Sequence, residues 1–304
     1  MKKELLAATA LSTATFSSLG PAAHAQVYNS KVYNWRGFYA GATVGGGGSN
    51  DSVGFAAPNS SAFNLGFVAN TPRFFATPFA AFSNAQTFTS WPSSLLAGHS
   101  YFSGGLEGGY NWQWGSVVLG IETDLSYLAG GRGTGSFAAT DTFSTTATTA
   151  GTRVSTLSVS AGVDWLYTLR PRVGYAIDRT LIYATGGLAV GGTHLSTSAS
   201  LDEQFVDAGK GPPPYHALGN WTGSNSSVNA GPVIGGGLEY AVTDHLTFKF
   251  EGLYYNLGRV SATANGTGTY TFSKGGATLL TVQAYTVNVL LDGFIARAGL
   301  NWRF

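Results

Sequence analysis

Nine charged side chains alternate with apolar or small residues along otherwise uncharged segments of the sequence. They are Glu107, Glu122, Asp124, Glu239 and Glu251, with Arg170, Arg172, Lys249 and Arg297. Paired carboxylates can hydrolyse glycosidic bonds, but that chemistry needs an open sugar-binding cleft between them. Acids and bases in near-balance, shielded from water, are more typical of an ion-paired network. We therefore predict a structural network and keep a narrow pore lined by the same groups as the alternative.

The five histidines offer little evidence for catalysis. Their positions, 24, 99, 194, 216 and 245, do not form a metal-binding cluster. His99 and His194 are expected near the outer rim of the predicted strands, where a Ser-His-acid lipid hydrolase could be built. A surface role is the simpler interpretation. We predict no catalytic, cofactor-binding or metal-binding residue, and no enzymatic turnover.

A period of two residues indicates the elements that position these charges. In "FIARAGLNWRF" (294–304), Phe294, Leu300, Trp302 and Phe304 share one face, whereas Arg297 and Arg303 share the other. A strand places successive side chains on opposite faces, and about 9–11 residues suffice for a tilted strand to cross a bilayer. Arg297 is expected to point inward, and Arg303 to meet water at the mouth. Six segments fit a strand in this way: 102–114, 117–127, 163–177, 233–242, 246–255 and 294–304. Two more, 38–45 and 181–190, fit less cleanly because both of their faces are apolar, with Gly and Ala, and they bring the candidate strands to eight.

The connections between these segments alternate between short and long. Three are only a few residues, and four span about 46–100, 129–157, 192–229 and 259–285. Short turns on one side and long loops on the other are typical of bacterial outer-membrane barrels. We predict an all-β fold: an eight-stranded antiparallel up-and-down transmembrane β-barrel with four long extracellular loops and short periplasmic turns. Both termini would then be periplasmic.

A soluble sandwich, with apolar faces inside, could show the same alternation. Three features favour the barrel. The apolar faces end in aromatic residues, as at membrane interfaces. The polar faces are rich in glycine, which leaves room for charged side chains in a narrow interior. The N-terminus also indicates export, through Lys2, Lys3, an apolar stretch and the small-x-small site at Ala23–Ala25.

The predicted domains are a cleavable signal peptide at 1–25, cut after Ala25, and one barrel domain at 26–304. Charged residues make up only 10% of the 304 residues, and the net charge of +1 argues against a nucleic-acid partner. The sequence contains no cysteine, which excludes disulfides and thiolate metal sites. No later stretch is long and apolar enough for a membrane helix.

Five ordered motifs carry a family resemblance: "NWRGFYAGATVG", "GGLEGGYNWQWGSVVLGIETDLSY", "LRPRVGYAIDRTLIYATGGLAVG", "GGGLEYAVTDHLTFKFEGLYYNLG" and "ARAGLNWRF". The sequence resembles the small outer-membrane β-barrel family of alphaproteobacteria. These are the 25/31 kDa outer-membrane immunogenic proteins, which are related to the OmpA-type transmembrane domain. The resemblance covers the eight strand segments and not the long loops, and the first loop here is unusually long and rich in phenylalanine.

The resemblance implies an abundant structural protein exposed at the surface of a Gram-negative cell, in the outer membrane. It also implies that Trp302 and Phe304 form the C-terminal signature recognised during barrel assembly. The expected partners are outer-membrane lipid, the barrel assembly machinery and a surface partner of the loops. We predict a structural protein and surface antigen with a charge-plugged interior. The alternatives are a narrow passive pore and, third, an outer-membrane lipid hydrolase.

Overall fold

The computed structural model describes residues 32–55, 92–144, 149–207, 215–271, 277–280 and 284–304. The predicted signal segment, its cleavage point after Ala25 and most of the phenylalanine-rich first loop lie outside these residues. The described residues all belong to one compact unit, which spans 32–304. Within the described ranges, no helix is long and apolar enough to cross a membrane.

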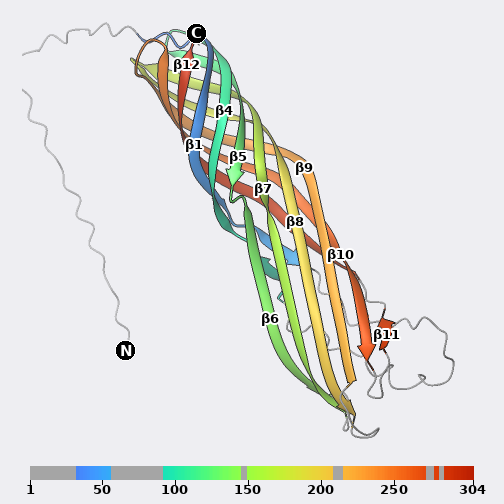
Figure 1. Cartoon of the computed structure of the whole chain (residues 1–304). Coiled ribbons are helices and arrows are strands. Elements are labelled where there is room, and N and C mark those ends of the chain that lie inside the picture. The colour runs from blue at the N-terminus through green and yellow to red at the C-terminus, as the bar shows by residue number, and fades with distance from the viewer. Residues whose placement is uncertain (1–31, 56–91, 145–148, 208–214, 272–276, 281–283) are drawn as a thin grey trace, which may run out of the picture. The chain divides into compact units, whose positions relative to one another are not determined.

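Eight main strands form a closed antiparallel ring (Figure 1). In ring order they are β1 (Gly37–Ser49), β4 (His99–Trp114), β5 (Val117–Ala129), β7 (Thr149–Ile177), β8 (Thr180–Asp207), β9 (Tyr215–Ala241), β10 (Leu246–Thr271) and β12 (Tyr285–Arg303). The ring closes because β12 pairs with β10 on one side and with β1 on the other. The predicted eight-stranded up-and-down barrel is therefore confirmed.

Consecutive strands are joined by tight turns at one end, here called the short-turn end. The turn between β4 and β5 uses Gly115 at a φ of 60°, and the turn between β7 and β8 uses Asp178 at a φ of 50°. Glycine adopts this left-handed backbone freely, and aspartate tolerates it better than most residues do. The other end, where the long connections lie, is here called the hairpin end.

The long connections consist largely of further strand within the described residues. Four further strands lie there: β2 (Ser52–Phe55), β3 (Ser94–Leu96), β6 (Arg132–Ser144) and β11 (Ala277–Leu280). β6 pairs with β7 along its whole length, and β8 and β9 stay paired well past the end of β5 (Figure 1). Much of the predicted loop ranges 129–157, 192–229 and 259–285 is therefore paired strand and not irregular chain.

This outer part of the ring is here called the extension. It comprises β2, β3, β6 and β11, with residues 149–163 of β7, 192–207 of β8, 215–229 of β9, 259–271 of β10 and 285–292 of β12. The remainder of the eight strands is the charged section. β7 and β10 each have a register shift at the junction, between Val163 and Trp165 and between Asn256 and Arg259. The extra residues change which face points inward in these two strands.

The polarity of the interior inverts at this junction. In the charged section the nine predicted charged residues are buried, although apolar residues such as Leu166, Leu253 and Ile295 are buried there as well. In the extension most buried positions hold an apolar core, beside one buried ion pair between Arg153 and Glu203. The core includes Leu157, Val159, Leu195, Leu201, Trp221, Val260, Tyr285, Val287 and Val289. In β12 the inward face stays on odd-numbered residues throughout, from Val287 to Arg297. Within β12 the inward residues thus change from apolar ones, such as Val287 and Val289, to the charged Arg297 without a register shift.

Candidate functional site

All nine predicted charged residues lie together in the interior of the charged section. Their exposed fractions range from 0% for Arg170 and Lys249 to 5% for Glu107. Inward-facing positions of six of the eight main strands supply them: β4, β5, β7, β9, β10 and β12. Period-two alternation explains the convergence, because every second residue of each strand faces the same narrow interior.

Lys249 lies at the meeting point of three acids. Oxygens of Glu107, Glu122 and Glu251 fall within 4.8 Å of one another, a spacing that could hold a metal ion. The Lys249 ammonium instead lies 2.8 Å from Glu107, 2.7 Å from Glu122 and 3.5 Å from Glu251. The protein therefore supplies its own cation to this cluster of carboxylates.

Two arginines connect Asp124 to these acids. Arg170 lies 2.6 Å from Glu122, 3.0 Å from Asp124 and 3.0 Å from Glu251. Arg297 lies 2.8 Å from Asp124 and 2.6 Å from Glu251. Charge-assisted bonds of this length are strong, and each carboxylate that shares two cations ties together strands distant in sequence. The network is therefore continuous across the interior.

Arg172 forms the part of the network nearest the short-turn end. Its guanidinium binds both carboxylate oxygens of Glu239, each at 3.0 Å, and lies 2.9 Å from Glu122. It also lies over the rings of Tyr39 and Tyr183, at 5.3 and 4.6 Å from the ring centres. These cation–π contacts add to the ion pairs in a site without water access.

Tyr39 and Tyr183 are members of the network that sequence analysis missed. The Tyr39 hydroxyl donates to Glu122 at 2.6 Å, and the Tyr183 hydroxyl donates to Glu251 at 2.9 Å. A Cβ on Gly109 would lie 2.5 Å from the Tyr39 hydroxyl, and one on Gly237 would lie 2.6 Å from the Tyr183 hydroxyl. These inward glycines thus make room for tyrosines. An inward tyrosine on a glycine-rich polar face is the signal that could have identified them.

The short-turn end is filled by the segment that precedes β1. Trp35 is fully buried, and its backbone N–H donates to the Gln113 side chain at 2.5 Å. The Arg303 guanidinium lies over the rings of Tyr33 and Trp35, at 5.1 and 5.4 Å, and donates to the Arg36 carbonyl at 3.0 Å. The expectation that Arg303 meets water at the mouth is wrong, since it is only 5% exposed. The preceding segment folds over it.

His99 lies at the hairpin end beside Ser49 and Asp51. Its Nδ1 is 3.2 Å from the Ser49 hydroxyl and 3.7 Å from Asp51, while the Ser49 hydroxyl donates to Asp51 at 2.8 Å. A Ser-His-acid relay uses one ring nitrogen for the serine and the other for the acid. Here both neighbours face Nδ1, so the cluster lacks the relay geometry. Burial raises the pKa of Asp51 to about 6.

The raised pKa predicts a pH-dependent contribution of Asp51 to stability. The unfolded carboxyl has a pKa near 3.8, so the folded state holds the proton more tightly. This stabilisation is complete at low pH and is lost as the pH rises through about 6. Asp51→Asn should therefore stabilise the protein more at about pH 8 than at about pH 4. Urea unfolding of both forms in detergent measures this difference, and an equal effect at the two pH values would contradict the prediction.

His194 lies on a different strand, on the outward face of β8. Its Nδ1 is 3.0 Å from the hydroxyl of Ser226 on β9, an exposed cross-strand contact. The nearest aspartate along β7, Asp164, is bound by Arg132 through two bonds of 2.7 and 2.6 Å, which lower the pKa of its carboxyl. The structure therefore does not bring His99 and His194 together, and it builds no relay around either of them.

The outward face of the charged section is a continuous apolar belt. Its middle carries exposed aliphatic side chains, among them Leu106 at 70% and Ile234 at 65%. Exposed aromatic rings border both ends: Phe38, Trp114, Tyr175, Tyr240 and Trp302 toward the short turns, and Phe102, Tyr127, Tyr254 and Phe294 toward the extension. Apolar outward faces with aromatic borders and a polar interior are the pattern of a membrane barrel, and the reverse of a soluble sandwich.

Two known outer-membrane proteins are similar to this chain in sequence. The chain is 33% identical to the 31 kDa outer-membrane immunogenic protein of Brucella melitensis biotype 1, over 61% of this chain and 65% of that protein. It is 31% identical to the 22 kDa outer membrane protein of Rhizobium leguminosarum bv. viciae, over 51% of this chain and 53% of that protein. The chain thus matches less than two thirds of the length of either relative.

Solved structures add little to this comparison. Neisserial surface protein A matches 88% of this chain and 97% of its own, at 12% identity and a TM-score of 0.27, which is too low to carry an argument.

The family model described as an outer membrane protein beta-barrel domain matches residues 6–290. With its closed ring and apolar belt, the chain therefore belongs to the outer membrane β-barrel domain family.

Proposed function

We propose that the protein is a structural component and surface antigen of the outer membrane, with a closed interior and no transport or catalytic turnover. In this proposal the hairpin end faces outward, and the short-turn end, with both termini, faces the periplasm. The extension then presents strand-built loops at the cell surface. The proposed partners are outer-membrane lipid, the barrel assembly machinery and a surface partner.

The observation that carries the proposal is the filled interior. The charged section is crossed by the network of nine ionised side chains, none more than 5% exposed. Beyond it, the apolar core of the extension lies across the same axis. A passive pore needs a continuous polar path, and an apolar constriction hinders ion passage by dewetting. Ions would have to pass both the charged network and the apolar core, which argues against the pore alternative.

Planar-bilayer recording of the refolded protein tests the proposal. We expect no stepwise conductance from the intact barrel. An unboiled sample should run faster than a boiled one on a detergent gel, which shows that the recorded protein is folded. Clean, reproducible channel steps from a preparation that passes this gel test would overturn the closed-interior proposal in favour of the pore.

Deleting Phe304 should reduce outer-membrane assembly much more than it reduces the stability of the refolded barrel. The ring is 79% exposed, and the backbone N–H makes one bond to the Phe38 carbonyl at 3.1 Å. Loss of one exposed ring and one such bond costs little in the folded state. Assembly is read from the membrane fraction of expressing cells, with Phe38→Ala as the matched control. Normal assembly of the truncated chain would rule out the proposed signature.

A further inference from the structure

The outward face of the extension carries a regular grid of hydroxyl groups. Strand register places two complete rows across β6, β7, β8 and β9: first Thr134, Ser160, Ser196 and Ser224, then Ser136, Ser158, Ser198 and Thr222. Neighbouring strands are about 4.8 Å apart, and alternate residues of a strand about 6.7 Å apart. The grid is therefore a consequence of register and not of a single loop conformation.

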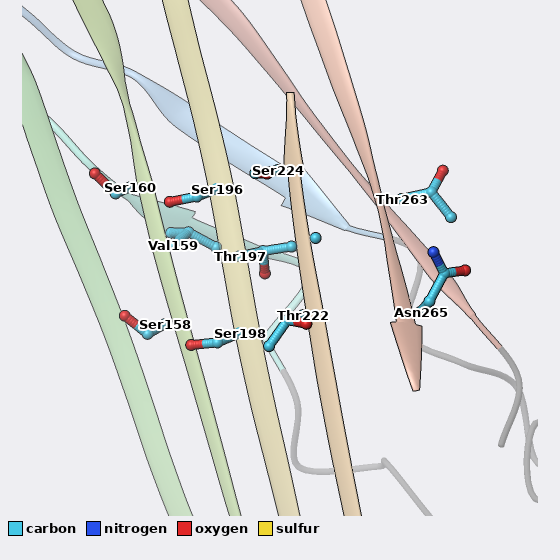
Figure 2. A pocket seen from close by; sticks show the side chains of 11 residues that line it. Ser158, Val159, Ser160, Ser196, Thr197, Ser198, Thr222, Ser224, Thr263 and Asn265 are labelled. Carbon is cyan, nitrogen blue, oxygen red and sulfur yellow. The ribbon is translucent and has the colours of Figure 1, made fainter. Parts of the chain in front are cut away.

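These hydroxyls are available for binding. Six of the eight residues are exposed and the other two, Ser160 and Ser196, are half-buried. None of the eight side chains has a hydrogen-bond partner within the part of the chain that the structure describes. A hollow of about 500 Å³ lies over the part of the grid on β7, β8 and β9 and is also lined by Thr263 and Asn265 of β10. Figure 2 shows the serines of β7 and β8 pointing to the same side.

The chemistry of the grid selects the class of ligand. Each hydroxyl can donate one hydrogen bond and accept two, which complements another hydroxyl-rich molecule. The two rows contain no Lys or Arg, the side chains that recognise phosphate. They also contain no aromatic or large apolar residue of the kind that forms the centre of a protein interface. A neutral polysaccharide fits these properties better than a phosphorylated ligand or a protein does.

The position of the grid indicates where that polysaccharide comes from. The grid begins one row beyond the Arg132–Asp164 ion pair, where the outward face has just changed from apolar to polar. It is continuous along β7, β8 and β9 with the lipid-facing belt. A glycan attached to a neighbouring membrane lipid would leave the bilayer surface at this level.

We propose that the two hydroxyl rows bind the neutral polysaccharide chain of outer-membrane glycolipid. This inference rests on the orientation given above, in which the extension faces outward. Many weak bonds across a repeating grid match a repeating polymer, and water can bridge where spacing differs. The rows would thus hold the sugar layer against the barrel wall.

The probe is neutral O-polysaccharide freed from lipid A by mild acid, taken from the smooth lipopolysaccharide of the organism that makes the protein. Binding to the folded protein in detergent is measured by calorimetry. The variant Ser158→Ala, Ser160→Ala, Ser196→Ala, Ser198→Ala should bind at least about tenfold more weakly. The matched control replaces four exposed threonines outside the rows, Thr140, Thr142, Thr152 and Thr267, and should bind like the unmodified protein.

The proposal would be overturned if the lipid-free polysaccharide did not bind, or if the row variant bound it as well as the unmodified protein does. Binding to lipid A alone would instead identify an acyl or phosphate ligand, and would also overturn it. The gel-mobility shift verifies that each variant folds. Labelling of Ser200→Cys by an impermeant maleimide on intact cells tests the orientation separately, because binding in detergent does not depend on it.

Discussion

Replacing Arg170 with alanine should lower the free energy of unfolding by about 3–5 kcal/mol, the cost of removing one partner from a buried ion network. Arg170 is fully buried and lies within 3.0 Å of Glu122, Asp124 and Glu251. Its loss would leave the five buried acids of the network with three cations in place of four. Urea unfolding of the refolded barrel, followed by tryptophan fluorescence, measures the change.

The matched control is Arg132→Ala. Arg132 makes an equally short pair with Asp164, at 2.6 Å, but the two side chains are 49% and 35% exposed. An exposed pair contributes only about 0–1 kcal/mol, so this variant should unfold almost like the unmodified protein. Adding Glu122→Gln to Arg170→Ala should recover part of the loss, because it removes one unpaired charge. Equal losses for Arg170→Ala and Arg132→Ala would refute a stabilising network.

Trp221→Ala should destabilise the extension by about 3–5 kcal/mol and leave the charged section folded. Trp221 is 1% exposed and lies in the apolar core of the extension. The charged network fills one section and most of the apolar core fills the other, so we expect the two sections to open separately. Limited proteolysis should cut the extension of the variant faster, while the unboiled sample keeps its gel-mobility shift.

Trp302→Ala is the control for this second prediction. Trp302 is 53% exposed on the belt, so its loss should leave the protease sensitivity of the extension unchanged. If Trp221→Ala also abolishes the mobility shift, the two sections unfold together and the separation at the junction is wrong.

The charged section could be predicted from the sequence because one signal runs through six of its eight strands. Isolated charges at every second position, with apolar residues between them, indicated the strand, its inward face and the interior network together. Arg170 and Glu251 are an example, since each lies inside an apolar alternation. Tyr39 was missed because an aromatic residue on a strand is more often expected on the lipid side.

The extension could not be predicted in the same way. Its outward faces are runs of Ser, Thr and Gly, as in residues 192–200, and such composition is equally typical of solvated loops. Its inward face is visible in "YTVNVLL" (285–291), where apolar residues alternate with polar ones. The alternation was present, but which of its two faces points inward depends on whether lipid or water surrounds the strand. A single sequence does not show where the bilayer ends.

In β12 the odd-numbered residues face inward in both the extension and the charged section, and this limits how such a protein can vary in length. Inserting one residue into this strand at the junction would turn Val287 and Val289 toward water, or Arg297 toward lipid. Two inserted residues would preserve both faces. We expect surface hairpins of this family to grow or shrink in steps of two residues per strand, with odd changes confined to bulges such as those of β7 and β10. Lengthening by two residues per strand would let the extension change in length while the charged section keeps its inward face.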